Sequence, residues 1–191
     1  MLNIVLFGPP GAGKGTQSEK MIEKFQLTHI STGDLFRKNI GEKTELGQLA
    51  QKYMDEGNLV PDEVVIGMVD ERIKECLDAK GFIFDGFPRT VAQAKALDTL
   101  LEEKDLSISG MIALEVDEDE LRTRILERGK SSGRTDDQSV EKINNRIRVY
   151  NEETLPVAQY YKSFDKYTAI NGVGTIDGIF GDICTAVEKI S

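Results

Sequence analysis

The sequence predicts an α/β fold in which a five-stranded parallel sheet has helices on both faces. Short apolar runs alternate with helical patterns along the 191 residues, and this alternation is typical of a parallel sheet whose two faces are covered. A glycine-rich stretch also joins the first apolar run to the first helical pattern. The expected strands are 3–7, 28–30, 82–84, 111–116 and 167–170.

The glycine-rich stretch reads Gly-Pro-Pro-Gly-Ala-Gly-Lys-Gly-Thr at 8–16. Its glycines allow a tight turn, so that successive N–H groups and the start of the next helix point at one anion. Lys14 adds a positive charge for the outer phosphates, and the hydroxyl that usually follows this lysine directly stands one residue later, at Thr16. We therefore expect a P-loop nucleoside triphosphate hydrolase-like fold that binds a mononucleotide triphosphate. A dinucleotide-binding domain is disfavoured because the loop is not Gly-x-Gly-x-x-Gly.

Helical patterns fill the intervals between the expected strands. Pro61 and Gly81 bracket one helix over 62–80, whose apolar positions include Cys76 and Leu77. Pro156 should bend or interrupt a long pattern over 139–164. The other expected helices lie at 14–25, 33–40, 45–56, 91–101, around 121–125 and at 176–187.

Two segments depart from the alternation of strand and helix, and such excursions are typical of lids and substrate-binding segments. Segment 31–60 holds two helical patterns with no strand between them. Segment 129–139 is polar and punctuated by glycine. We expect a single domain over 1–191, with a core of 1–30, 61–128 and 140–191; a plain surface connection is the alternative for 129–139.

The charge of the chain is unevenly distributed. The formal net charge is −9, which argues against a general affinity for nucleic acid or for an anionic membrane. Six of the nine arginines nevertheless lie between Arg122 and Arg148, where we expect local phosphate binding rather than a solvated helix face. No apolar run reaches membrane-spanning length and the first residues do not resemble a secretory leader, so a cytoplasmic location is expected.

The cysteines and the single histidine are expected to play structural roles. Cys76 and Cys184 lie far apart among apolar residues, which favours buried free thiols in a reducing compartment over a disulfide. His29 stands beside an expected strand end. A structural role for His29 is favoured over service as a proton carrier.

Phosphoryl chemistry has candidates at the carboxyl end of the strand 82–84. Asp85 is placed to hold Mg²⁺ directly or through water, with a turn cap before Gly86 as the alternative. Arg89 follows in Asp-Gly-Phe-Pro-Arg, a rigid turn that aims its guanidinium over the same edge. The arginines expected to close over the phosphates are Arg124, Arg128, Arg134, Arg146 and, as the alternative to the last, Arg148.

Several motifs in order resemble those of the adenylate kinases over nearly the whole chain. They are 8–17, Ser-Thr-Gly-Asp-Leu-Phe-Arg at 31–37, Gly-Asn-Leu-Val-Pro-Asp at 57–62, Asp-Gly-Phe-Pro-Arg-Thr at 85–90, Gln93, Arg128-Gly and Gly-Arg-Thr-Asp-Asp at 133–137. The resemblance implies reversible transfer of the terminal phosphoryl group of Mg-ATP to AMP, giving two ADP. It also implies a monomer whose partners are ATP, AMP and ADP.

The resemblance assigns a role to each matching position. Those implied for ATP are Gly11, Ala12, Gly13, Lys14, Gly15, Thr16, Arg128 and Gly174. Those implied for AMP are Thr32, Arg37, Asn58, Leu59, Val60, Gly86, Phe87, Pro88, Arg89, Gln93, Arg134 and Arg146. The implied catalytic cations are Lys14, Arg89, Arg124, Arg128, Arg134 and Arg146, with Asp85 and, as a second candidate, Thr16 for Mg²⁺. Asp136 and Asp137 would anchor a lid over 129–139, and 31–60 would bind the monophosphate.

Three departures qualify this assignment. The lid is of the short type without cysteines, so no structural zinc is expected. The spacing after Asp137 leaves the choice between Arg146 and Arg148 open. Phe36 stands where many relatives have a smaller or unbranched apolar residue in the AMP pocket.

Two other functions are disfavoured by residues of the same motifs. UMP/CMP kinases share the short lid but typically carry a small apolar residue at the position of Thr32 and Asn at that of Gln93; a glutamine amide suits the edge of adenine. A nucleotide-binding switch would need no second anion site, so Arg37 and Arg89 count against it.

Overall fold

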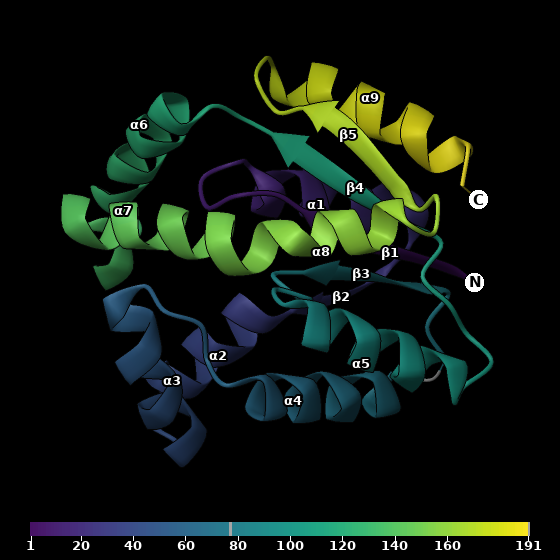
Figure 1. The fold of residues 1–191 in the computed structure, drawn as a ribbon, viewed down its shortest axis with the longest axis horizontal. Coiled ribbons are helices and arrows are strands. Elements are labelled where there is room, and N and C mark those ends of the chain that lie inside the picture. The colour runs from purple at the N-terminus through teal and green to yellow at the C-terminus, as the bar shows by residue number, and fades with distance from the viewer. Residues whose placement is uncertain (77, 191) are drawn as a thin grey trace.

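The computed structural model describes residues 1–76 and 78–190, so the expected helical position of Leu77 lies outside the described residues. One parallel sheet of order β2-β3-β1-β4-β5 forms its centre. The strands are β1 (Leu2–Phe7), β2 (Thr28–Ser31), β3 (Gly81–Asp85), β4 (Gly110–Glu115) and β5 (Tyr167–Asn171). Every described pairing is parallel, which confirms the predicted fold class (Figure 1).

Helices cover both faces of this sheet and also form the excursions at one end of it. They are α1 (Lys14–Phe25), α2 (Thr32–Gly41), α3 (Glu45–Glu56), α4 (Asp62–Glu75), α5 (Val91–Glu102), α6 (Glu118–Gly129), α7 (Val140–Val149), α8 (Leu155–Lys162) and α9 (Ile176–Glu188). A short 3₁₀ turn (Thr135–Asp137) precedes α7, and a π-helical turn (Tyr150–Thr154) joins α7 to α8.

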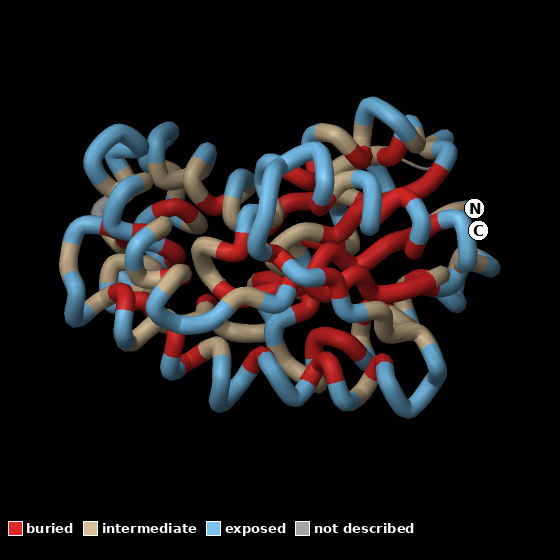
Figure 2. The backbone as a smooth tube through the Cα atoms, turned by 90° about the horizontal axis from the view of Figure 1, so that it is seen from above, coloured by how far each residue is buried: buried red, intermediate tan, exposed pale blue. Residues whose placement is uncertain are grey.

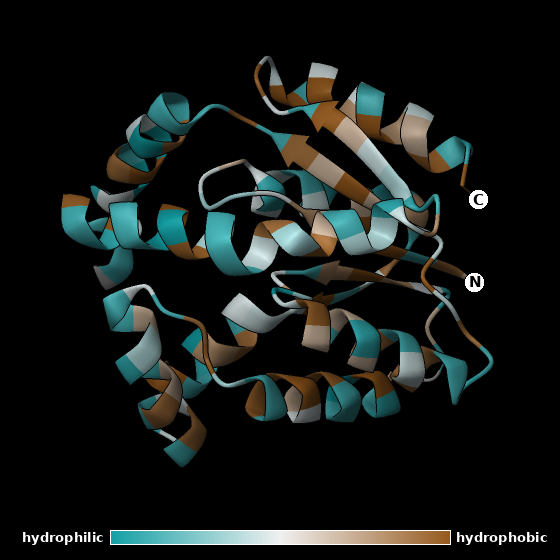
Figure 3. Ribbon diagram, viewed as in Figure 1, coloured by the Kyte–Doolittle hydropathy of each residue, from teal (hydrophilic) through white to brown (hydrophobic). Residues whose placement is uncertain are grey.

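The side chains of β1 alternate between two apolar cores. Val5 and Phe7 face the core shared with α4, α5 and α8, whereas Ile4 and Leu6 face the core shared with α1 and α9. This alternation is the period-two geometry of a strand buried on both sides. Buried backbone accordingly runs through the strands in Figure 2, and teal predominates on α6 and α7 in Figure 3, where the arginine-rich stretch lies.

The helix expected over 62–80 ends five residues early, at Glu75. Cys76 leaves helical geometry (φ −122°, ψ 36°) and is half-buried, so only Cys184 is a buried free thiol. Gly81 is not the stop signal that the sequence suggested. It begins β3, where a Cβ would lie 2.1 Å from the backbone oxygen of Leu2, so glycine is required by close strand packing.

The interruption expected at Pro156 is confirmed. Pro156 occupies the first turn of α8, directly after the π-helical turn. That turn carries Tyr150, whose ring lies 5.7 Å from that of Phe7, and Thr154, and both side chains line the cavity described below.

Both excursions lie at the same end of the molecule, opposite the two termini (Figure 1). Segment 31–60 forms α2 and α3, and 129–139 carries the 3₁₀ turn. Asn145 of α7 bridges toward the first excursion, because its Nδ2 donates to the backbone oxygen of Glu56 at 2.6 Å and to Oδ1 of Asn58 at 3.1 Å. The carboxyl ends of the strands are thus enclosed between the two.

Candidate active site

A cavity of about 600 Å³ lies at the carboxyl edge of the sheet, within the size range of small-molecule sites. It is lined by the glycine-rich loop, by α2 and 57–60 of the first excursion, by 85–89 after β3, and by arginines of α6, 129–139 and α7. The residues predicted for the site line it with one exception, Gly174. Gly174 belongs to the turn between β5 and α9 and is not among the lining residues.

The glycine-rich loop presents the beginning of α1 to this cavity. Gly13 caps the helix in the left-handed region at φ 93°, and Lys14 is its first residue. Gly11 is also left-handed at φ 84°, where a Cβ would lie 2.8 Å from the side chain of Ile125. The loop therefore packs against α6 at a distance only glycine permits, and it leaves the helix N-terminus open to an anion.

The ammonium of Lys14 is held over the loop. Its Nζ donates to the backbone oxygens of Gly8 at 2.7 Å and Pro9 at 3.0 Å. Desolvation lowers the pKa of Lys14 to about 8, against the opposing charge of Asp85. The lysine is thus a cation that two backbone oxygens hold beside the loop in a desolvated position.

Asp85 ends β3 and lies beside His29. His29 Nε2 is 3.7 Å from Asp85 Oδ2, and both residues line the cavity. Burial raises the pKa of Asp85, but the interaction with His29 and the charge of Lys14 outweigh it and hold the pKa below its usual value. Asp85 is therefore an ionised oxygen donor. His29, expected to be structural, is also a neighbour of this carboxylate.

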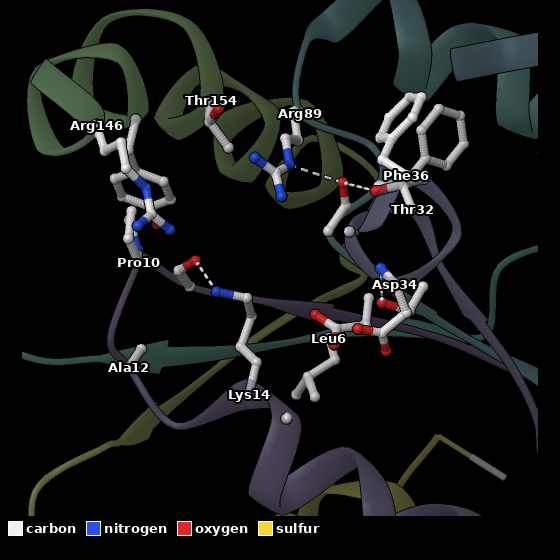
Figure 4. A pocket seen from close by; sticks show the side chains of 18 of the residues that line it. Leu6, Pro10, Ala12, Lys14, Thr32, Asp34, Phe36, Arg89, Arg146 and Thr154 are labelled. Atoms are coloured by element: carbon white, nitrogen blue, oxygen red, sulfur yellow. Dashed lines mark hydrogen bonds between the residues drawn. The ribbon is translucent and has the colours of Figure 1, made fainter. Parts of the chain in front are cut away.

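Gly86 ties two of the predicted residues together. Its backbone oxygen accepts hydrogen bonds from Thr32 Oγ1 at 2.7 Å and from Arg89 Nε at 2.8 Å. Figure 4 shows Arg89 and Thr32 converging on this carbonyl, and Arg89, Arg146 and Lys14 directed toward one space. Desolvation and the nearby charge of Arg146 lower the pKa of Arg89 to about 10, so it stays protonated at neutral pH.

The first excursion contributes an arginine and an aromatic residue. Arg37 pairs with Asp34 one turn earlier on α2, and both line the cavity. Phe36, on the same helix, is buried in the apolar core, so only part of it borders the cavity. The large side chain of Phe36 is thus accommodated mainly in the apolar core rather than in the cavity.

Asp137 organises the arginines of α6 and α7. Its carboxylate is fully buried and accepts from Arg128 Nε at 2.6 Å, from Arg128 Nη2 at 2.9 Å and from Arg146 Nη1 at 2.5 Å. Asp136 adds an ion pair with Arg146 at 3.0 Å. Both arginines therefore reach the cavity from a fixed anionic anchor.

The remaining arginines predicted for the phosphates differ in their surroundings. Arg124 pairs with Glu120 at 2.7 Å and donates to the backbone oxygen of Gly172 at 3.1 Å, and Arg134 also lines the cavity. Arg148 is outside it and pairs with Glu152 at 2.6 Å. The structure thus brings Arg146, and not Arg148, to the site.

Asp62, for which no site role was predicted, contacts the buried side chain of Gln93. Gln93 Nε2 donates to Asp62 Oδ1 at 2.8 Å, and Gln93 Oε1 accepts from the backbone N–H of Arg89 at 2.7 Å. Asp62 lies 31 residues away on another helix. In the sequence Asp62 ends the Gly-Asn-Leu-Val-Pro-Asp motif and begins the helix after Pro61, and a helix start by itself accounts for an acidic residue there.

Asp85 and Thr16 present a carboxylate and a hydroxyl to the same cavity. Oxygen donors of this kind suit Mg²⁺, which keeps several waters and usually takes one or two protein ligands with substrate phosphates. Among the described residues no group of three or more His, Cys, Asp or Glu side chains is placed to hold a metal by itself. The residues present fit an ion that arrives with a nucleotide.

The comparisons with known proteins agree with this geometry. The family model described as adenylate kinase matches residues 6–166. The chain is 58% identical over 190 residues to an adenylate kinase of Flavobacterium psychrophilum and 53% identical over 190 residues to one of Bacteroides thetaiotaomicron, with 100% of both chains covered in each case. Within the described residues no helix has the length and apolarity needed to cross a membrane. The chain belongs to the adenylate kinase family.

Proposed function

We propose that this protein catalyses reversible transfer of the terminal phosphoryl group from ATP to AMP, giving two ADP. The observation that carries the proposal is one cavity lined by two sets of cationic groups, to which we assign two anion-binding regions. The glycine-rich loop with Lys14 forms one, and Arg37 with Arg89 forms the other. A protein that only bound or hydrolysed a triphosphate would need the first region alone.

The donor side is the loop 8–16 together with the lid arginines. Backbone N–H groups at the start of α1 would hold the ATP phosphates, and Lys14 would neutralise the outer ones. Arg124, Arg128 and Arg146 approach the same space from α6 and α7. Cations placed in advance stabilise the charge that spreads over the migrating group without reorganising during transfer.

The acceptor side is bounded by α2, 57–60 and 86–89. Arg37, Arg89 and Arg134 would hold the phosphate of AMP. The hydroxyl of Thr32 donates its hydrogen bond to the backbone oxygen of Gly86. Its own oxygen is therefore left as an acceptor, which suits the 6-amino group of adenine. No general base is required, because the attacking atom is a phosphate oxygen that is already ionised.

Asp85 and Thr16 would hold Mg²⁺, with Asp85 acting directly or through water. The ion supplies positive charge that neutralises the phosphates and helps orient them. The two excursions, 31–60 and 129–139, would close over the substrates and exclude water, which favours AMP as the acceptor.

The test is ADP formation from ATP and AMP with and without excess Mg²⁺, in the parent and in Lys14→Met. We expect Lys14→Met to lower kcat on the order of 10³-fold, equivalent to roughly 4 kcal/mol of transition-state stabilisation. Lys189→Met, at the end of α9 and away from the cavity, is the matched control. Near-normal turnover in Lys14→Met would refute the role of the loop.

A further inference from the structure

The carboxamide of Gln93 is held at both ends by protein groups. Gln93 is 1% exposed, is the third residue of α5, and lines the cavity. Its Oε1 accepts from the backbone N–H of Arg89 at 2.7 Å, and its Nε2 donates to Asp62 Oδ1 at 2.8 Å. One N–H and one lone pair of the amide remain for a ligand.

The backbone N–H of Arg89 and the carboxylate of Asp62 together fix the orientation of the Gln93 carboxamide. A backbone N–H can only donate, and an ionised carboxylate can only accept. A reversed amide would set its NH₂ against the Arg89 N–H and its oxygen against Asp62, leaving both interactions repulsive. The free donor and the free acceptor of Gln93 therefore have a defined order.

Asp62 is itself held in place by the helix that carries Gln93. Thr90 Oγ1 donates to Asp62 Oδ2 at 3.0 Å and accepts from the backbone N–H of Gln93 at 3.1 Å, as the N-cap of α5. Asp62 is the first residue of α4, directly after the excursion 31–60 and Pro61. Among the described residues it is not one that lines the cavity, so it acts on a ligand only through Gln93.

We propose that Asp62 is a positioning residue that sets base selection by fixing the direction of the Gln93 amide. The proposal rests on the proposed function, in which AMP occupies the acceptor side. Adenine presents a ring acceptor at N1 beside a donor at its 6-amino group. Hypoxanthine presents the reverse, a donor at N1 beside an acceptor at O6. The fixed amide suits one of these edges, whereas a freely turning amide would accept both.

The experiment compares kcat/KM for AMP and for inosine 5′-monophosphate in the parent and in Asp62→Asn. Asparagine keeps the shape of the Asp62 side chain. Unlike a carboxylate, however, its amide can present either a donor or an acceptor to Gln93. Asp62→Asn removes a hydrogen bond from Gln93 to a charged group. The ratio of kcat/KM for inosine 5′-monophosphate to kcat/KM for AMP should therefore rise about tenfold, chiefly because the KM for AMP rises. The KM for ATP should not change. Glu63→Gln, an exposed neighbour on the same turn, is the charge-matched control and should leave the ratio unchanged.

A double-mutant cycle separates positioning from a general loss of structure. If Asp62 acts through Gln93, then Asp62→Asn adds nothing to the ratio once Gln93→Ala is present. An unchanged ratio in the folded Asp62→Asn protein, or an equal effect in the Gln93→Ala background, would overturn the inference. A parent that does not prefer AMP at all, or transfers to no monophosphate, overturns the proposed function and the inference with it.

Discussion

The guanidinium of Arg128 lies against the fully buried carboxylate of Asp137 in a two-pronged pair, Nε to Oδ2 at 2.6 Å and Nη2 to Oδ1 at 2.9 Å. Arg146 adds a third hydrogen bond to the same carboxylate. Two arginines of the cavity thus share one acidic side chain, and an uncompensated partner in a buried pair is costly.

Replacing Asp137 by Asn should loosen this anchor. Two arginines lose a charged acceptor worth roughly 2 kcal/mol, so kcat/KM for ATP should fall on the order of 30-fold. Amide exchange in 129–139 should rise at the same time. Glu127→Gln, an exposed acid on α6, should change neither quantity. Unaltered exchange in Asp137→Asn would contradict the anchoring role.

The same carboxylate predicts a pH dependence of stability. Burial raises the pKa of Asp137, but the hydrogen bond and charges of Arg128 and Arg146 outweigh it, so the pKa lies below the ordinary 3.8. A depressed pKa in the folded state means that the stabilisation is present above about pH 4 and is lost as the pH falls through the folded pKa. The difference in unfolding free energy between parent and Asp137→Asn should therefore be constant from pH 6 to about pH 4 and shrink as the pH falls further. A difference that stays constant throughout would show that Asp137 gains no stabilisation from its charge.

Arg146 and Arg148 form a matched pair for testing the cationic site. Only Arg146 lines the cavity, while Arg148 is half exposed and pairs with Glu152 on the surface. Arg146→Ala should lower kcat on the order of 10²- to 10³-fold, whereas Arg148→Ala should stay within about twofold. Steady-state ADP formation measures both. The opposite ranking would place the functional arginine at 148.

Gly86 is a position where a side chain should disturb AMP more than ATP. Its φ is +73°, and a Cβ would lie 3.0 Å from Arg89 Nη2 and 3.1 Å from Thr32 Oγ1. Gly86→Ala should cost about 1 to 2 kcal/mol of folding free energy and raise the KM for AMP, with the KM for ATP nearly constant. Gly67→Ala, inside α4 with open space around it, should instead stabilise by up to about 1 kcal/mol. Equal effects on both KM values would argue against local disturbance of the AMP side.

The sequence predicted the fold well because its strongest signals are local. The apolar runs locate all five strands, the glycine-rich loop locates the start of α1, and Pro156 marks the break before α8. The end of α4 was wrong because Gly81 serves strand packing, which depends on Leu2 and is invisible in a local pattern. The same limit applies to Cys76, which lies just past the helix and is half-buried.

In the candidate site, too, local motifs were predicted from the sequence, whereas contacts between distant segments were not. Residues in compact motifs, such as 8–16 and 85–89, were placed at the cavity by sequence because parallel strands end at one edge. The Asp62–Gln93 contact joins two helices and needed the tertiary structure. Gly174, assigned through family resemblance alone, lies outside the cavity lining. The choice of Arg146 over Arg148 likewise required the position of α7 relative to the sheet.

The most direct measurement of the central claim is phosphoryl transfer from Mg-ATP to AMP, CMP, UMP and GMP in parallel, with a reaction lacking any acceptor. We predict strong preference for AMP, dependence on Mg²⁺, and little ATP hydrolysis without acceptor, because we assign the cavity a second anion site and expect the excursions to exclude water when they close. Preference for CMP or UMP would contradict the base assignment of Thr32 and Gln93. ATP binding without transfer to any acceptor would contradict the proposed function itself.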